Sequence, residues 1–255
     1  MIISTSRKQS APSNHSKRSS GSKLPIVIVA IIVAIVALFA SVAMSCSNQT
    51  KYDWSNLKLE NGRMVYYEDG NAVSTTGIDV SDLQGSIDWQ AVKNDGIDFA
   101  MLRCGRRGST EGQLYTDKNY YENVEGATRV GLPYGVYFFS QALTADEARE
   151  EAEFVLENLD GRNLQMPVVF DHETIAGKSG RADNISDDAL VECATAFCEA
   201  VEAAGYETMV YGNRKDLSRF SPIDGSKASA GALAETLGGR SIWFAEYGDP
   251  APTAP

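Results

Sequence analysis

A short stretch of the chain decides the fold: Pro167-Val168-Val169-Phe170-Asp171-His172-Glu173, an apolar run that ends in two carboxylates two residues apart. Side chains at positions i and i+2 of a β-strand point to the same face of the sheet. We therefore expect Asp171 and Glu173 to project together from the end of a buried strand, with His172 on the other face, packed beneath helices. Gly77-Ile78-Asp79-Val80-Ser81 repeats the pattern of an apolar strand with an acid.

The spacing of the two acids suits acid–base chemistry. Two carboxyl groups about 6–7 Å apart on one strand face can hold different protonation states, because burial and the neighbouring charge move their pKa values apart. Hydrolysis of a glycosidic bond uses one protonated and one ionised carboxyl group. A strand end with two solvated acids is the alternative interpretation, and the second strand with an acid, at Asp79, weighs against it.

Short apolar runs alternate with amphipathic stretches from Gly77 onward, which predicts a parallel sheet with helical crossovers, an α/β fold. Apolar strands with polar residues only at their C-terminal ends favour a β/α barrel, whose sites lie at that rim. An open doubly wound sheet is the alternative, but no glycine-rich phosphate motif follows the first strand. Thr144 and Glu147 form a capping-box pattern. The predicted strands are 77–81, 98–103, 134–139, 167–171, 208–211 and 241–246, and the predicted helices are 88–95, 117–130, 144–159, 187–204 and 228–237.

The N-terminal region differs in composition from the rest. Residues 1–23 carry five basic residues and no acid, which is typical of a disordered cytoplasmic tail. Residues 24–45 contain no charge and are long enough for a transmembrane anchor. The basic flank places the N-terminus in the cytoplasm and the later residues outside the cell. We expect a single-pass protein of the cell membrane, with secretion after signal cleavage as the alternative.

A linker and a small hairpin should precede the main domain. Residues 46–60 are polar and are expected to be a linker, and Asp69-Gly70 forms the turn of a hairpin that ends near residue 75. Residues 76–255 then form the globular domain.

The charge and the cysteines exclude several classes of site. The whole chain carries −11 and its first 24 residues +5, which leaves −16 for residues 25–255. A domain with this negative charge is not expected to bind nucleic acid, because phosphate binding needs clustered Lys and Arg. The four cysteines and two histidines show no metal-ligand spacing, so we expect no metal and no cofactor. Packing is the expected role of Cys104, Cys193 and Cys198.

Several motifs in a fixed order resemble glycoside hydrolase family 25, the Chalaropsis-type lysozymes found among bacterial autolysins and phage endolysins. The resemblance covers about residues 77–250 and rests on ordered blocks rather than on any one of them. These blocks are Gly77-Ile78-Asp79-Val80-Ser81, Gln84-Gly85 with Ile87-Asp88-Trp89, Phe99-Ala100 with Leu102-Arg103, Gly131-Leu132-Pro133-Tyr134-Gly135-Val136-Tyr137-Phe138-Phe139-Ser140, Asp171-His172-Glu173 and Trp243-Phe244-Ala245-Glu246-Tyr247.

The resemblance implies a β/α barrel that cleaves the β-1,4 bond between N-acetylmuramic acid and N-acetylglucosamine in peptidoglycan. It implies that Glu173 is the general acid, that Asp171 is a neighbouring carboxylate that orients or stabilises the reacting centre, and that Asp79 is the acid of the first strand. Crowding by the two aspartates should raise the pKa of Glu173. A route in which the substrate's own N-acetyl group forms the intermediate stays open.

Residues at other strand ends are candidates for sugar binding. Arg103 is expected to pair with Asp79 or a neighbouring acid, and a plain surface arginine is the alternative. Glu246 belongs either to the cleft or to a solvated strand end. For two of the aromatic candidates, at positions 137 and 243, core packing is as good an interpretation as sugar contact. The aromatic candidates are Tyr137, Tyr211 and Trp243.

The resemblance also implies a further segment and a last strand with another Asp, which this sequence does not contain. Six strands are predicted, whereas a β/α barrel has eight, so we expect a barrel without its C-terminal strands. The expected partners are peptidoglycan glycan strands, and the membrane through residues 24–45; the catalytic domain, residues 76–255, is expected to be monomeric. The alternatives are a chitinase-like endo-N-acetylglucosaminidase and a non-catalytic wall-binding module.

Overall fold

The computed structural model of the chain describes residues 53–175, 177, 179–220 and 235–246. The chain divides into two compact units, Met1–Asp53 and Trp54–Pro255, and nearly all of the first lies outside the described residues. The predicted tail (1–23) and anchor (24–45) are among the residues not described. Within the described part of the chain, no helix is both long and apolar enough to cross a membrane.

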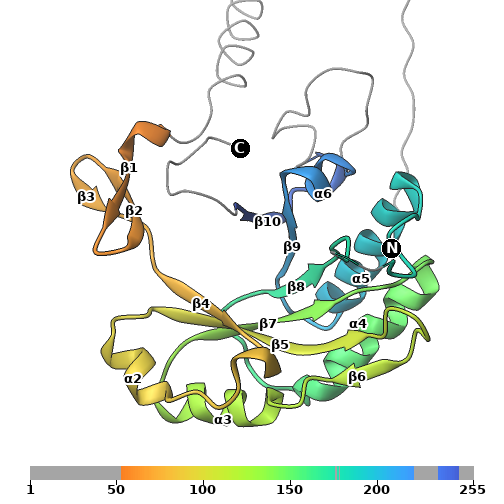
Figure 1. Cartoon of the computed structure of the whole chain (residues 1–255), viewed down its shortest axis with the longest axis horizontal. Helices are drawn as coiled ribbons and strands as arrows, with labels where there is room; N and C mark the ends of the chain where they lie inside the picture. The colour runs from red at the N-terminus through yellow and green to blue at the C-terminus, as the bar shows by residue number, and fades with distance from the viewer. Residues whose placement is uncertain (1–52, 176, 178, 221–234, 247–255) are drawn as a thin grey trace, which may run out of the picture. The chain divides into compact units, whose positions relative to one another are not determined.

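A curled, mainly parallel sheet organises the second unit (Figure 1). Its strands follow the order β10-β9-β8-β7-β5-β4, and every pair of neighbours in this order is parallel. A short strand, β6, pairs antiparallel with β5 beyond this path. The curl is that of a half-barrel, which confirms the predicted parallel sheet with helical crossovers. The strands are β4 Gly77–Val80, β5 Phe99–Arg107, β6 Leu114–Thr116, β7 Tyr134–Phe139, β8 Val168–Asp171, β9 Thr208–Asn213 and β10 Ser241–Ala245.

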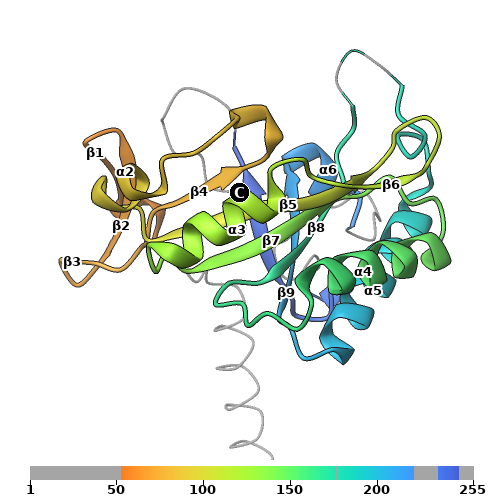
Figure 2. The ribbon, with the colours of Figure 1, turned by 90° about the horizontal axis from the view of Figure 1, so that it is seen from below.

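Four helices cover the outer face of the curled sheet, as Figures 1 and 2 show from two directions. They are α2 Trp89–Asn94, α3 Tyr120–Arg129, α4 Ala145–Leu159 and α5 Asp187–Ala203. Each one lies within three residues of a predicted helix. A further short helix, α6 Arg214–Ser218, follows β9 and was not predicted. Most of the helix predicted at 228–237 falls outside the described residues.

Alternation along the strands separates two apolar layers. Side chains on the outer face pack against the helices; Phe138 and Phe170, for example, both contact the ring of Phe197 on α5 at centroid distances of 6.5 and 5.4 Å. Each of these fully buried rings contributes about 1.5–3 kcal/mol by leaving water. Cys104, Cys193 and Cys198 are free and buried in the same layer, which confirms their packing role. The inner face carries a smaller cluster of Met101, Val169, Tyr211 and Ala245.

One irregularity interrupts the alternation. The pairing of β5 with β7 shifts between Arg103 and Gly105, so that Arg103 pairs with Tyr137 but Arg106 pairs with Phe139. This is a β-bulge, in which one strand carries an extra residue.

The predicted hairpin is present next to the barrel sheet. It consists of β1 Leu57–Glu60, β2 Arg63–Glu68 and β3 Asn71–Ala72, preceded by a 3-10 turn at Trp54–Asn56. Asp69 and Gly70 both have positive φ (49° and 81°), as a two-residue turn of this kind requires. The predicted linker is wrong for residues 57–60, which pair with β2 and form an additional strand. Arg63 fixes the hairpin to the end of α2 through Asp95, at 2.6 Å.

Candidate active site

Three carboxylates belong to the inner side of the curled sheet at its C-terminal rim. Asp79 lies on β4, Asp171 ends β8, and Glu173 follows two residues later. Asp171 is 5% exposed, Glu173 is half-buried and Asp79 remains accessible to solvent. His172 is buried and its Nε2 lies 3.4 Å from Nη1 of Arg219, a residue that also pairs with Asp187 of α5. β8 ends at Asp171, so Glu173 lies two residues beyond the strand, but the charges of Glu173 and Asp79 both act on Asp171, which places the three acids near one another.

The three acids share a poorly solvated environment. Burial raises the pKa of Asp171 well above its usual value, and the charge of Glu173 raises it further, while Arg103 acts in the opposite direction. Burial also raises the pKa of Glu173, followed by the negative charges of Asp216 and Asp79. Surrounding protein atoms raise the pKa of Asp79. All three shifts favour the neutral form of the acid, which is the direction that a general acid requires.

One oxygen of Asp171 has no protein partner. Its Oδ1 is buried and accepts no hydrogen bond from the described residues. A buried oxygen without a partner costs free energy unless a water or a substrate supplies one. The lack of a donor at this oxygen in the described part of the chain agrees with the raised pKa of Asp171, because no hydrogen bond to it stabilises the charged form.

Arg103 is held at the rim by two acids other than Asp79. Its guanidinium forms ion pairs with Asp82 and, at 2.7 Å, with Asp117. Asp82 opens a 3-10 turn, Asp82–Gln84, directly after β4, and Asp117 is fully buried after β6. The expected pairing with a neighbouring acid is thus confirmed. Asp117, which the sequence did not single out, lies 14 residues from Arg103 and becomes its neighbour only through the fold.

The three candidate aromatic residues meet on the inner face. The Trp243 ring makes edge-to-face contacts with Tyr211 at 5.0 Å and with Tyr137 at 6.2 Å. Burial raises the pKa of Tyr137, and the charges of Asp171 and Asp79 act in the same direction. The rings therefore pack together and also lie close to the acids.

A cavity of about 360 Å³ opens on this inner face. Asp79 and Trp243 both line it, so the cavity joins a candidate acid to a candidate aromatic residue. Its remaining wall is mostly apolar and includes Phe99, Met101 and Met209. The cavity reaches the N-terminal ends of the strands at Gly77, Phe99 and Pro167, and neither Asp171 nor Glu173 is among the residues that line it.

Glu246 follows β10 and its side chain is 49% exposed. It lies 3.8 Å from a guanidinium nitrogen of Arg214. This position fits the interpretation of a solvated strand end, and its role in binding stays a prediction.

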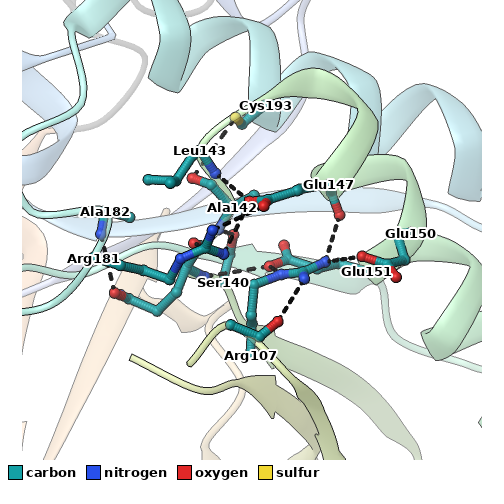
Figure 3. A network of polar contacts seen from close by, with 12 residues as sticks. Arg107, Ser140, Ala142, Leu143, Glu147, Glu150, Glu151, Arg181, Ala182 and Cys193 are labelled. Atoms are coloured by element: carbon teal, nitrogen blue, oxygen red, sulfur yellow. Dashed lines mark hydrogen bonds and ion pairs between the residues drawn. The ribbon is translucent and has the colours of Figure 1, made fainter. Parts of the chain in front are cut away.

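A network of polar side chains supports the site from the helical side (Figure 3). Arg107, at the end of β5, is 4% exposed and contacts Glu151 at 2.8 Å and Glu150 at 2.7 Å, both on α4. Arg181, in the loop after β8, makes a two-pronged ion pair with Glu147 at 2.8 and 3.0 Å. The loop that follows Glu173 is therefore fastened to α4.

Glu147 departs from the predicted capping box. Thr144 does cap α4, because its hydroxyl accepts a hydrogen bond from the Glu147 backbone N–H at 3.2 Å. The Glu147 carboxylate, however, accepts from the Leu143 N–H at 2.8 Å and pairs with Arg181 instead of closing the box on Thr144. The arginine from a distant loop changes the partner, and no local pattern could indicate this.

The sequence reasoning missed one acid near the site. Asp216 lies on α6, is 2% exposed, and its charge acts on both Glu173 and Asp171. Asn213 precedes it by three residues at the end of an apolar strand, which is an N-cap signal for a helix too short to show periodicity.

Proteins of similar sequence and structure point to one family. The chain is 29% identical over 176 residues to the autolytic lysozyme of Clostridium acetobutylicum, covering 69% of this chain and 46% of that protein. The modular autolysin LytC from Streptococcus pneumoniae is 26% identical with a TM-score of 0.52, covering 64% of this chain and 39% of that one. The spore cortex lytic enzyme SleM of Clostridium perfringens shares the fold, with a TM-score of 0.58 at 24% identity over 74% of this chain and 59% of that one.

The chain spans less than two thirds of each of these three proteins. The model of the family described as glycosyl hydrolases family 25 matches residues 78–253, more than two thirds of the sequence. The chain belongs to glycosyl hydrolases family 25.

Proposed function

We propose that this protein is a lysozyme that hydrolyses the β-1,4 bond between N-acetylmuramic acid and N-acetylglucosamine in peptidoglycan. The single observation that supports it best is the group of Asp79, Asp171 and Glu173 at one rim, where burial raises the pKa of each of the three acids. The names of relatives agree: one is an autolytic lysozyme, and LytC has been solved with a synthetic peptidoglycan ligand.

In the proposed reaction Glu173 donates its proton to the glycosidic oxygen while the bond from that oxygen to the anomeric carbon breaks. Positive charge then develops at the anomeric carbon. If the oxygen of the substrate's own N-acetyl group attacks that carbon, the charge lies instead on the five-membered ring that this attack forms. Asp171 and Asp79 stabilise that charge in either case, since negative groups in a poorly solvated site act strongly on it. Water finally adds to the anomeric carbon and its proton returns to Glu173.

The remaining rim residues serve binding in this proposal. The faces and edges of Tyr137, Tyr211 and Trp243 suit contact with pyranose rings, which are apolar on their faces. Arg103 is already neutralised by Asp82 and Asp117, so it positions the rim more than it attracts a charged substrate.

The proposed location follows from residues outside the described part of the chain. The uncharged stretch 24–45 after a basic flank supports a membrane anchor with the catalytic domain outside the cell, where peptidoglycan lies. Protease treatment of intact spheroplasts tests this proposal: the domain should be degraded from outside while a tag on residues 1–23 survives. A domain released into the medium would instead support signal cleavage.

The proposal is tested by replacing Glu173 with glutamine and measuring the clearing of purified cell walls. Loss of the proton donor should slow clearing by about 10²–10⁴-fold. Glu153→Gln, a change at an exposed position on α4, is the matched control and should clear walls at the parental rate. Circular dichroism should show that both variants are folded.

Analysis of the products separates the alternatives. New reducing ends on muramic acid support the lysozyme, whereas new ends on glucosamine support an endo-N-acetylglucosaminidase. Wall binding by a parent protein that produces no ends supports a binding module. Full clearing by Glu173→Gln would remove Glu173 from the mechanism.

A further inference from the structure

A fourth acid, Asp216, is fixed rigidly beside the three carboxylates although it is not on a strand. Asn213 caps α6, accepting hydrogen bonds from the backbone N–H groups of Lys215 at 2.9 Å and Asp216 at 3.0 Å. The Asn213 amide also donates to Oδ2 of Asp216 at 2.5 Å. One oxygen of the carboxylate is therefore held by the end of β9.

The other oxygen connects α6 to the catalytic strand. Oδ1 of Asp216 accepts from the hydroxyl of Thr174 at 3.5 Å, and Thr174 is the residue directly after Glu173. Gly212 lies closely under α6, because a Cβ at that position would lie only 3.0 Å from a side-chain carbon of Leu217, the residue after Asp216. The short helix thus lies tightly against β9, with its acid directed to the chain that leaves β8.

The charges around Asp216 are unevenly distributed. On its own helical segment Lys215 and Arg219 lower its pKa, but burial raises it by more. Arg219 is engaged elsewhere, with Asp187 at 2.8 Å and the Ile185 carbonyl at 2.6 Å.

On the strands the charges near this acid are negative. The charge of Asp216 raises the pKa of both Glu173 and Asp171 on the β8 side, and Asp79 of β4 acts on the same two groups. Arg103, the cation that acts on Asp171, already forms ion pairs with Asp82 and Asp117.

We propose that Asp216 is a positioning residue of the active site, which holds the chain after Glu173 through Thr174 and places a further carboxylate beside the proposed donor. This inference rests on the proposed function, because it has meaning only if Glu173 donates a proton. Asp216 contributes in two ways, through its contact with Thr174 and through its negative charge, and different substitutions remove each of them.

Asp216→Asn removes the charge and keeps the shape. Initial rates of the full chain on soluble peptidoglycan fragments, measured from pH 4 to 9, should fall off at the basic side about 1 pH unit earlier than in the parent, since a like charge no longer raises the pKa of the donor. Thr174→Val removes the contact and keeps the charge. Its basic limb should stay in place while kcat falls by about tenfold or less through looser positioning.

Asp216→Glu restores the charge and should return the basic limb toward its parental position, which also tests the inference if Asp216→Asn folds poorly. Asp188→Asn, at an exposed acid on α5, is the control for loss of one negative charge and should leave the profile unchanged. If Asp216→Asn is folded and the basic limb of its pH–rate profile does not move, the proposed effect of the Asp216 charge is wrong. If kcat is unchanged in Thr174→Val, the proposed role of the contact between Thr174 and Asp216 is wrong. Glu173→Gln keeps the two questions apart: if it retains activity, the proposed function fails, whatever Asp216 does.

Discussion

The acids on the two faces of the sheet differ in whether arginines neutralise them. On the inner side acids gather with little positive charge to neutralise them. On the helical side each acid of the network in Figure 3 has an arginine. The inner group consists of Asp79, Asp171, Glu173 and Asp216, and the outer group consists of Glu147, Glu150 and Glu151, with Arg107 and Arg181.

The pKa values follow the arginines and the degree of burial. Although burial alone would raise it, Arg181 and the Leu143 N–H lower the pKa of Glu147. The fully buried Glu151 stays high, at about 7, because burial outweighs its bond to Arg107. On the inner side burial raises the pKa of all four acids, and like charges add to the shift at Asp171 and Glu173. The acids with arginine partners therefore fasten elements of the fold together, and the proposed function assigns the chemistry to the acids of the inner group.

The largest expected effect is on the paired side. Arg107→Met should lower the free energy of unfolding by about 3–5 kcal/mol, because it leaves Glu151 buried without its cation. Urea unfolding at pH 8 measures this change. Arg106→Met, at the neighbouring residue, whose guanidinium lies over the Tyr115 ring at 5.4 Å, is the control and should cost about 1 kcal/mol or less. Equal losses in the two variants would contradict the distinction between the faces.

The next effect belongs to the unpaired side and concerns activity rather than stability. Asp171→Asn should slow hydrolysis by about 10²–10³-fold, since it removes a charge aimed at the reacting centre. Its unfolding free energy should stay the same or rise, because the substitution relieves repulsion among like charges. Wall-clearing rates and urea unfolding of the same preparation check both statements, and a marked loss of stability would contradict the second.

The pH dependence of stability gives a third, smaller effect. The pKa of Glu151 rises from 4.5 to about 7 on folding, so between those values the folded protein keeps a proton that the unfolded chain releases. The free energy of unfolding should therefore fall as the pH rises through this window, by about 2–3 kcal/mol. Glu151→Gln cannot ionise and should flatten this part of the curve. A parallel curve in that variant would show that other groups cause the dependence.

The smallest effect comes from a partly exposed pair. Arg181→Met should lower the free energy of unfolding by about 1 kcal/mol or less, because water screens its bond to Glu147. Arg149→Met, which breaks the far more exposed pair with Asp146, should produce no measurable change. Thermal unfolding distinguishes the two, and a larger loss in Arg149→Met would reverse the ranking by burial.

Residues that follow a regular period could be predicted from the sequence. The strand that ends at Asp171 and the strand that carries Asp79 read directly from apolar runs, and alternation then places Glu173 with them. Short elements such as β6 and α6 contain too few residues for a period, so they were missed. Asp216 could not be recognised for the same reason, since its position depends on how α6 packs against β9.

Partners distant in the sequence could not be predicted either. Arg103 reaches Asp82 and Asp117, 21 and 14 residues away, and Arg181 reaches Glu147, 34 residues away. Each bond joins a residue on β5 or in the loop after β8 to an acid on or next to another element, so it follows from the fold and not from any local pattern. The sequence predicts that Arg103 lies at the rim, and the structure identifies Asp82 and Asp117 as the acids that neutralise it.

The β-bulge in β5 decides on which face of the sheet each of the strand's two arginines, Arg103 and Arg107, lies. Arg103 and Arg107 are four positions apart, so in an unbroken strand both guanidinium groups would emerge on the substrate side. The additional residue near Cys104 moves every later side chain of β5 to the opposite face of the sheet. Arg107 therefore points toward the helices, where it pairs with Glu151. A regular strand of the same length, with every residue paired in turn, would carry a second cation to the rim and leave Glu151 without a counterion.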